Sequence, residues 1–472
     1  MLLRNARVDG AIVDIRMDDG AITEIGSGLD GDGIDLAGRF VVPGLWDEHV
    51  HMSQWALVQQ RLDVSSAGSA AETATLVRAA VDLAVPGVTF VGQGFRDGLW
   101  PDEPSLAVLD AATGGHPVVL ISADLHAAWL NSAALTRYGH PTHPTGLLRE
   151  DQAFEVTRRV GEVPQDLLDG WVADAGRAAA ARGVVGIVDL EMDWNLATWQ
   201  RRMESGFDSL RVEFGIYRQH LEQAIDLALR TGRRVTDLLT VGRFKVLTDG
   251  SLNTRTAYCA EHYPGRPGEH GLLEVPREEL VGLLNRAVGA GIEPSVHAIG
   301  DAANTVALDA FDQVGCGGRI EHAQLVAATD FERFAHLGVV ASVQPEHAMD
   351  DRDVADHYWG DRIERSYAWR RLLEAGAELA FGSDAPVAPL DPWITMAAAV
   401  GRDRDGREPW QPQERLSVAQ ALAASVRTRV AVGQPADLAV TDIDPFTASS
   451  AELRGMPVAA TLLGGRFTWL TS

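Results

Sequence analysis

Short apolar runs alternate with longer amphipathic stretches through the centre of this 472-residue chain. Such alternation is typical of βα units round a parallel barrel, whose strands are buried on both faces. Helical periodicity separates most of the runs, for example over Glu278–Ala290 and Ala368–Ala375. The pattern therefore predicts an α/β fold built on a (β/α)8 TIM barrel, formed by residues 41–54 and 183–429. Eight runs are its predicted strands: Phe40–Trp46, Val184–Leu190, Arg211–Tyr217, Arg243–Thr248, Ile292–His297, Arg319–His322, Val339–Gln344 and Glu378–Asp384.

Both ends of the chain have a shorter, strand-like pattern. Residues 1–40 and 430–472 contain brief alternating runs separated by turn-forming residues, and Gly464-Gly465 can form a hairpin turn. Because neither region can bury a core alone, we expect the two to pair in one small β-sandwich beside the barrel. The predicted strands are Ala6–Val8, Ile12–Met17, Ala21–Ile25, Ala436–Val440, Ala459–Leu463 and Arg466–Leu470.

Residues 55–182 are too many for a single crossover between barrel strands. They include strand-like runs at Val88–Gly92 and Pro117–Ser122, and a loop rich in Pro, His and Thr at His140–Gly146. We interpret the span as a subdomain inserted after the first barrel strand. Insertions at the carboxyl ends of barrel strands lie over the catalytic face, so this subdomain is expected to cap the active site.

Composition narrows the functional classes. The 66 acidic and 41 basic residues give a net charge of −25, which disfavours binding to nucleic acid and to anionic membranes. No apolar run approaches the roughly 20 residues that span a bilayer, and the start of the chain lacks the apolar core of a signal peptide. The only cysteines, Cys259 and Cys316, exclude a disulfide framework and suit a reducing compartment. We therefore expect a cytoplasmic protein that acts on a small molecule.

Ligand-type side chains end five of the predicted strands. His49 and His51 are two residues apart, so both side chains of a strand would point to one side and converge on a metal ion. Lys245 is unusual, because an ammonium group would be repelled by metal cations. It either lies elsewhere or reacts with CO2 to give a carbamate, whose two oxygens could bridge two ions. The full predicted ligand set is His49, His51, Lys245, His297, His322 and Asp384.

Pro43–His51 resembles the PGxxDxHxH signature of the amidohydrolase superfamily. The ligand set resembles that of its binuclear subtype, in which a carboxylated lysine joins two divalent ions. The resemblance covers nearly the whole chain and implies a hydrolase of N-acyl or N-formyl amides, with zinc as the expected metal. Four stretches resemble the branch that contains N-substituted formamide deformylase: Asp124–Leu135, Lys245–Ala257, His297–Asp301 and Ser342–His347.

The resemblance also implies separate roles for the predicted ligands. The two histidines of the first strand and Asp384 are assigned to the more buried ion. His297 and His322 are assigned to the outer ion, with carboxylated Lys245 between the two. Two ions roughly 3.5–4 Å apart bring the pKa of a bridging water towards 7, so that hydroxide forms and attacks the amide carbonyl. Asp384 is the expected catalytic residue, which moves the proton of this water to the leaving nitrogen.

For several other residues, both a substrate contact and a structural role are possible interpretations. His126 and Trp129 either contact substrate from the inserted subdomain or serve as a local cap and as core packing. Arg255 either binds a substrate oxygen or pairs with a structural carboxylate. Asp47 is expected to orient His49 or its strand. The predicted substrate-binding residues are His126, Trp129, Arg255, Gln344 and His347.

Three alternatives stay open. A mononuclear deaminase on the same barrel would use the histidines and the aspartate without the lysine bridge. Cyclic amides, ureas or esters would also be open to attack by the same hydroxide. A non-catalytic ligand-binding relative of the fold is the third alternative, although a complete ligand set counts against it. Carboxylate and imidazole ligands also suit manganese, iron and cobalt, and analogy with other barrels suggests a homodimer.

Overall fold

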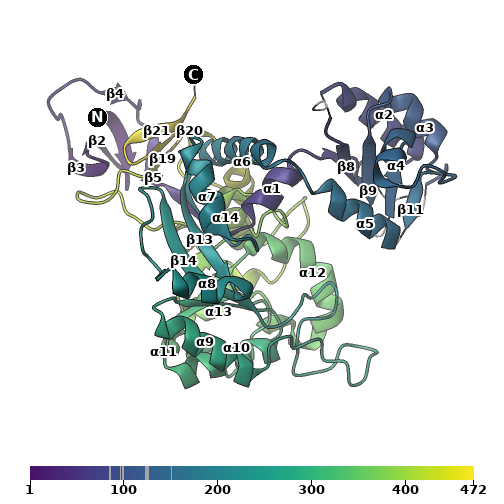
Figure 1. Ribbon diagram of the computed structural model, residues 1–472. Helices are drawn as coiled ribbons and strands as arrows, with labels where there is room; N and C mark the ends of the chain where they lie inside the picture. Colours follow the sequence, from purple (N-terminus) through teal and green to yellow (C-terminus); the bar gives the residue numbers. More distant parts are fainter. Residues whose placement is uncertain are drawn as a thin grey trace. The chain divides into compact units, whose positions relative to one another are not determined.

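The computed structural model describes residues 1–83, 85, 87–95, 97, 100–122, 127–149 and 151–471 (Figure 1). The chain divides into two compact units. One consists of Met1–Met52 and Gly176–Ser472, and the other of Ser53–Ala175. The inserted unit thus begins directly after the first barrel strand, close to the predicted bounds of 55 and 182.

The larger unit contains a parallel sheet with the strand order β18-β17-β16-β15-β14-β13-β12-β6. Its edges meet where the N–H of Asp384 donates to the carbonyl of His49 at 2.7 Å and the N–H of His51 donates to Ala385 at 2.8 Å. The predicted TIM barrel is therefore confirmed. Its strands are β6 (Leu45–Val50), β12 (Val184–Asp189), β13 (Arg211–Tyr217), β14 (Leu239–Leu247), β15 (Pro294–Ala298), β16 (Gly318–His322), β17 (Val339–Val343) and β18 (Leu379–Phe381).

The prediction of the first barrel strand as Phe40–Trp46 was wrong. Phe40–Pro43 forms β5, which pairs with β19 (Leu438–Thr441) of the terminal sheet, and the barrel strand starts at Leu45. The chain changes sheets at Gly44, where a Cβ atom would lie 2.4 Å from the Val185 side chain, so only glycine fits there. The true strand was hidden because three of its six buried residues, Asp47, Glu48 and His49, are ionisable, which is typical of loops rather than of barrel strands.

A β-bulge changes which side chains of β6 face the barrel interior. Between two pairs with β12, Ile187 with Asp47 and Asp189 with Val50, β6 advances three residues and β12 only two. Alternation therefore breaks, and the adjacent residues Glu48 and His49 both contact side chains of β16. Asp47, the residue expected to orient His49 or its strand, bonds to the backbone of this strand. Its Oδ1 accepts the backbone N–H of His49 at 3.2 Å and of Ser383 at 2.9 Å.

The two ends of the chain form one sheet with the order β21-β20-β19-β5-β1-β2-β3, and β4 pairs with β1. Both halves contribute to one hydrophobic core, which includes Leu3, Ile15, Leu438 and Leu462, as the predicted sandwich requires. Gly464 and Gly465 have φ values of 56° and 74°, as expected for the predicted tight hairpin turn. The remaining strands are β1 (Leu2–Val8), β2 (Ala11–Asp18), β3 (Ala21–Gly26), β4 (Ile34–Asp35), β20 (Val458–Leu463) and β21 (Arg466–Leu470).

The helices of the larger unit follow the barrel strands (Figure 1). The predicted helices at 278–290 and 368–375 correspond to α9 and α13. The bounds of each helix differ from the prediction by one residue at both ends. These helices are α7 (Asn195–Glu204), α8 (Leu221–Asp226), α9 (Arg277–Gly289), α10 (Asp301–Val314), α11 (Phe331–Leu337), α12 (Pro345–Trp359), α13 (Trp369–Glu374), α14 (Pro392–Gly401), α15 (Val418–Ala424) and α16 (Ser450–Arg454).

The inserted unit has a sheet with the order β11-β10-β9-β8-β7. The strands are β7 (Leu62–Asp63), β8 (Phe90–Phe95), β9 (Val118–Ser122), β10 (Ala127–Leu130) and β11 (Leu147–Arg149). The helices are α2 (Ala70–Ala80), α3 (Leu106–Thr113), α4 (Ser132–Tyr138) and α5 (Asp151–Val160), while α1 (Met52–Val58) and α6 (Gln165–Ala180) connect the unit to the rest of the chain. A hydrophobic core lies on each side of its central strands.

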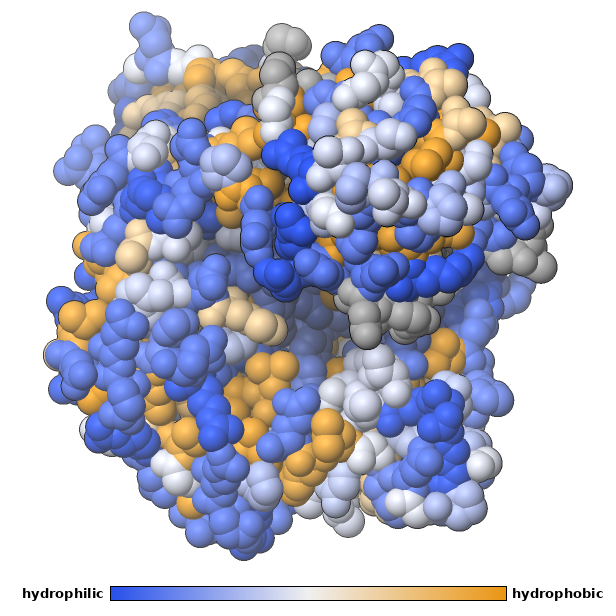
Figure 2. Space-filling model, turned by 45° about the vertical axis from the view of Figure 1, so that its right-hand side comes forward, coloured by the Kyte–Doolittle hydropathy of each residue, from blue (hydrophilic) through white to orange (hydrophobic). Residues whose placement is uncertain are grey.

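The surface agrees with the acidic composition. On the face drawn in Figure 2, hydrophilic residues predominate and hydrophobic ones occur in small groups. Among the helices that the structure describes, none combines the length and the apolar character needed to cross a membrane.

Candidate metal centre

The carboxyl ends of the barrel strands bring the predicted ligands together. One nitrogen or oxygen each of His49, His322 and Asp384 lie within 4.8 Å of one another, and all three residues are buried. The Oδ1 atom of Asp384 is 3.4 Å from the Nε2 atom of His49 and 3.2 Å from that of His51. The His297 ring is centred 4.5 Å from the His322 ring. Imidazoles and a carboxylate so arranged are typical ligands of a divalent transition metal.

Two of these residues have an unusual backbone conformation. His322 at the end of β16 and Asp384 beyond β18 have φ values of 77° and 56°. Non-glycine residues in the left-handed region cost on the order of 1–3 kcal/mol and are concentrated at functional sites. The bends occur where the strands end at the mouth of the barrel, and both side chains join the cluster.

Two buried partners fix the orientation of two imidazoles. The Nδ1–H of His49 donates to Oε2 of Glu321 at 2.7 Å, and the other carboxylate oxygen of Glu321 accepts from Ser295 Oγ at 2.5 Å. The Nδ1–H of His322 donates to Oε1 of Gln344 at 2.8 Å. Each bond leaves the Nε2 atom of the ring as the available ligand, which is the usual arrangement of metal-bound histidines.

Sequence reasoning missed Glu321. The sequence feature that could have identified Glu321 is its position in β16, two residues after the inward-facing Arg319 and directly before His322. Gln344 was expected to bind substrate. The structure places it in a buried position, where its Oε1 atom accepts from Nδ1 of His322, and its contact with substrate stays a prediction.

Electrostatics favour the ligating forms of His49, His322 and Asp384. Burial, together with the nearby Lys245 ammonium, lowers the pKa of His49 to about 4. Burial also holds the pKa of His322 well below its usual range. Burial alone would raise the pKa of Asp384, but the surrounding histidines hold it well below its ordinary value. Neutral imidazoles and an ionised carboxylate are the forms that bind metal.

Lys245 is buried, and its Nζ atom has no hydrogen-bond partner among the described residues. Burial lowers its pKa, while the carboxylates of Glu321 and Asp384 act in the opposite direction. His51 Nδ1 and His347 Nε2 are likewise buried without a partner within the described part of the chain. Polar atoms left unpaired inside a protein are costly. The donor set therefore fits metal ions, and the lowered pKa of Lys245 favours the neutral amine, the form of a lysine that can react with CO2.

The other predicted substrate-binding residues have different surroundings. His347 lies in the first turn of α12, with its Nε2 atom 3.8 Å from Asp384 Oδ2. Arg255 has a φ of 58°, and its guanidinium lies 5.8 Å from the centre of the Tyr358 ring, near the far end of α12. Trp129 is fully buried in the core of the inserted unit, the packing role that the sequence left open. His126 lies outside the described residues.

A buried ion-pair layer lies inside the barrel and was not predicted. Glu48 accepts from Arg319 at 2.7 Å and from Arg427 at 2.6 Å. Arg427 also pairs with Glu213 of β13 at 2.7 Å, and its guanidinium lies 3.7 Å from the centre of the Trp46 ring. Because these residues come from β6, β13, β16 and the segment after α15, the layer joins distant parts of the barrel wall.

Comparisons with known proteins agree with this geometry. A sequence profile of the amidohydrolase family matches residues 32–469. The protein LONG AFTER FAR-RED 3 of Arabidopsis thaliana is 32% identical, covering 86% of this chain and 77% of its own. The N-substituted formamide deformylase of Arthrobacter pascens is 25% identical, over 92% of this chain and 89% of the deformylase. The crystal structure of an uncharacterized metal-dependent hydrolase from Pyrococcus horikoshii OT3 is 25% identical, covers 95% of this chain and 99% of that chain, and has a TM-score of 0.79.

The family match extends over the barrel and over the strands of the terminal sheet from β4 onwards, and the similar structure is described as a metal-dependent hydrolase, which agrees with a histidine and aspartate cluster that could hold a metal ion. This chain belongs to the amidohydrolase family and is an enzyme that hydrolyses C–N bonds.

Proposed function

We propose that this enzyme hydrolyses N-acyl or N-formyl amides at a binuclear metal centre, with zinc as the first metal to test. The observation that carries the proposal is Lys245. Its amine is buried without a partner among the described residues, next to a cluster of histidines and Asp384. A carbamate on this amine would supply two oxygens, enough to bridge two ions. The similarity to an N-substituted formamide deformylase supports amides as the substrate class.

The chain's own residues have separate tasks in this proposal. His49, His51 and Asp384 would hold one ion, His297 and His322 the other, and carboxylated Lys245 both. When bound, two divalent ions supply Lewis acidity and make a coordinated water a nucleophile near neutral pH. The buried partners of the imidazoles, Glu321 and Gln344, keep the Nε2 atoms facing the centre.

Asp384 is the proton-transfer group of the proposal. Its pKa is held well below the ordinary value, so that the carboxylate is ionised and able to accept a proton from water. An amide nitrogen leaves poorly until it is protonated, and a carboxylate beside it can deliver the proton that it has accepted. His347 faces the second oxygen of Asp384 and would hold it in position for both transfers.

Metal content tests the proposal directly. We would purify the chain with bicarbonate and without chelator, and measure metal per chain by plasma mass spectrometry. About two equivalents in the parent chain and a clear loss in Lys245→Ala are expected. One equivalent that Lys245→Ala does not change would refute the lysine bridge and favour a mononuclear deaminase. Rates of hydrolysis for N-formyl, N-acetyl and cyclic amides, with and without chelator, then define the substrate.

A further inference from the structure

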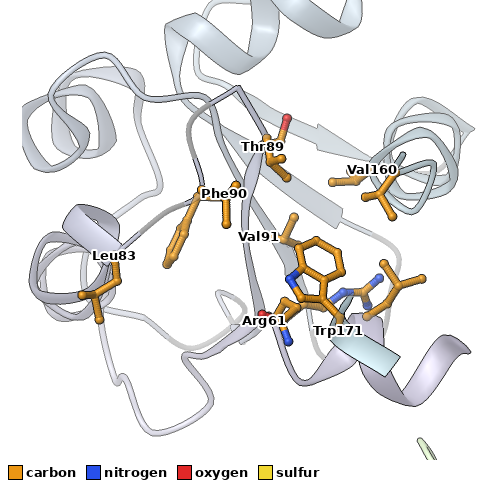
Figure 3. A pocket seen from close by; sticks show the side chains of 12 residues that line it. Arg61, Leu83, Thr89, Phe90, Val91, Val160 and Trp171 are labelled. Carbon is orange, nitrogen blue, oxygen red and sulfur yellow. The ribbon is translucent and has the colours of Figure 1, made fainter. Parts of the chain in front are cut away.

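The inserted unit contains a pocket of about 100 Å³ (Figure 3). Most of its walls are apolar, and they come from the end of α1, the start of β8, and the helices α5 and α6 with the turn between them. Leu83 at the pocket is 85% exposed, and Val85 beside it is 41% exposed. Exposed apolar side chains around an apolar hollow are typical of a ligand site. The apolar side chains of the walls include Leu57, Phe90, Val91, Val160, Val163 and Trp171.

Arg61 is the one charged residue in the described lining of this pocket. Its Nη1 atom donates to the side-chain amide oxygen of Gln93 at 2.8 Å. Burial lowers the pKa of Arg61, and within the described part of the chain no carboxylate acts against that effect. By contrast, the more exposed Arg149 of the same unit pairs with Asp97 at 2.7 Å.

A partly buried guanidinium without a counter-charge is destabilising, and the chain has 66 acidic residues that could have supplied one. Arg61 has five N–H donors in a planar fork that fits a carboxylate. Figure 3 shows Arg61 and Trp171 among the side chains that project into the pocket. The pocket therefore combines an apolar body with one cation at its wall that has no carboxylate partner among the described residues.

We propose that this pocket binds a small amphipathic carboxylate. The carboxylate would pair with Arg61, and the apolar part would pack on Phe90, Val91 and Trp171. An apolar cavity of about 150 Å³ takes up benzene, so a pocket of about 100 Å³ that opens to solvent limits the apolar part to about one ring or a short branched chain. A neutral ligand would leave the guanidinium unpaired, and a cationic one would be repelled by it. The pocket is lined by residues of the inserted unit, whereas the metal centre is formed by residues of the larger unit, and occupation of the pocket does not depend on the proposed reaction.

The test is calorimetric titration of the full chain with benzoate. We expect saturable binding at one site, weakened by about tenfold or more in Arg61→Gln, because a charge-assisted pair is replaced by a neutral contact. Benzamide, which has the shape of benzoate without its charge, should bind the parent chain at least about tenfold more weakly than benzoate. Arg78→Gln is the matched control and should leave benzoate binding unchanged, since Arg78 donates to the backbone carbonyl of Ala111.

Arg61→Lys keeps the charge but loses the planar fork, and should bind with intermediate affinity. Thermal melting of each variant checks that the inserted unit stays folded, and the benzamide comparison needs no variant. Three results would overturn the proposal: no saturable benzoate binding, equal affinity for benzamide, or undiminished binding by Arg61→Gln. The last result is also what benzoate bound to metal ions would produce, so the variant separates the two sites.

Discussion

Glu321 offers the sharpest test of how the buried surroundings of the metal centre control metal binding. Its Oε2 atom accepts from Nδ1 of His49 at 2.7 Å, and both side chains are 1% exposed. Glu321→Gln keeps the size of the side chain and an oxygen that can accept the same hydrogen bond. The change therefore removes the negative charge behind His49 and little else.

Two known magnitudes set the expected loss of metal affinity in Glu321→Gln. A hydrogen bond to a charged group contributes about 1.5–3 kcal/mol, of which roughly half comes from the charge. Residues that hold a metal-bound histidine in this way change metal affinity or activity by about 10–100-fold when they are mutated. We expect Glu321→Gln to weaken metal binding by about tenfold or slightly more. The loss should be largest for the ion that His49 holds.

Competition with a chromophoric chelator measures this affinity without relying on turnover. Ser295→Ala is the matched control, because it removes a hydrogen bond from the other oxygen of Glu321 and leaves the charge in place. A neutral bond contributes about 0.5–1.5 kcal/mol, so the control should lose less affinity than Glu321→Gln. If Glu321→Gln binds metal like the parent chain, or the control loses more, Glu321 does not act through its charge on His49.

Three further predictions concern proton transfer, the ion-pair layer and metal-linked stability. Asp384→Asn should keep much of its metal in mass spectrometry but lower kcat by about 10²–10⁴-fold, because the amide cannot accept the proton; near-normal turnover would contradict this role. Glu48→Gln should lower the unfolding free energy by about 3 kcal/mol in urea titrations, since it leaves the buried Arg319 without its carboxylate partner, while Arg427 keeps Glu213. Although burial favours the neutral acid, these two guanidinium groups lower the pKa of Glu48 to about 2. Its stabilisation is therefore full above pH 4.5 and lost as the pH falls towards 2, and the parent chain should lose more stability over this window than Glu48→Gln. Removing metal with a chelator should lower the thermal midpoint, and added zinc should restore it; an unchanged midpoint would argue against metal bound at the barrel mouth.

The fold could be predicted wherever local pattern and tertiary environment agree. Strands β12, β17 and β18 are largely apolar runs of mostly buried residues, and the hairpin at Gly464-Gly465 follows from two residues that tolerate positive φ. Prediction failed at β6, because the ion pairs that stabilise its buried Glu48 come from Arg319 and Arg427, hundreds of residues away. No local window contains that information.

The same limit applies to the metal centre. The spacing of His49 and His51 and the residues at later strand ends identified a candidate ligand set, and the structure brings the histidines and Asp384 together. The contacts of Glu321 with His49 and of Gln344 with His322 cross between strands, so they depend on barrel closure and register. Residue type alone does not distinguish a residue that contacts substrate from one that orients a metal-binding side chain.

The bulge in β6 has a consequence for protein engineering. It divides one short strand into two segments that serve different ends of the barrel: Glu48 belongs to the ion-pair layer, and the histidines that follow belong to the centre at the mouth. Glu48 is the one residue between Asp47 and His49, so its deletion would restore regular pairing with β12 but would remove the carboxylate that Arg319 and Arg427 share. Libraries that vary this enzyme should therefore hold the length of the segment constant, because the residue that makes the bulge also anchors the ion-pair layer.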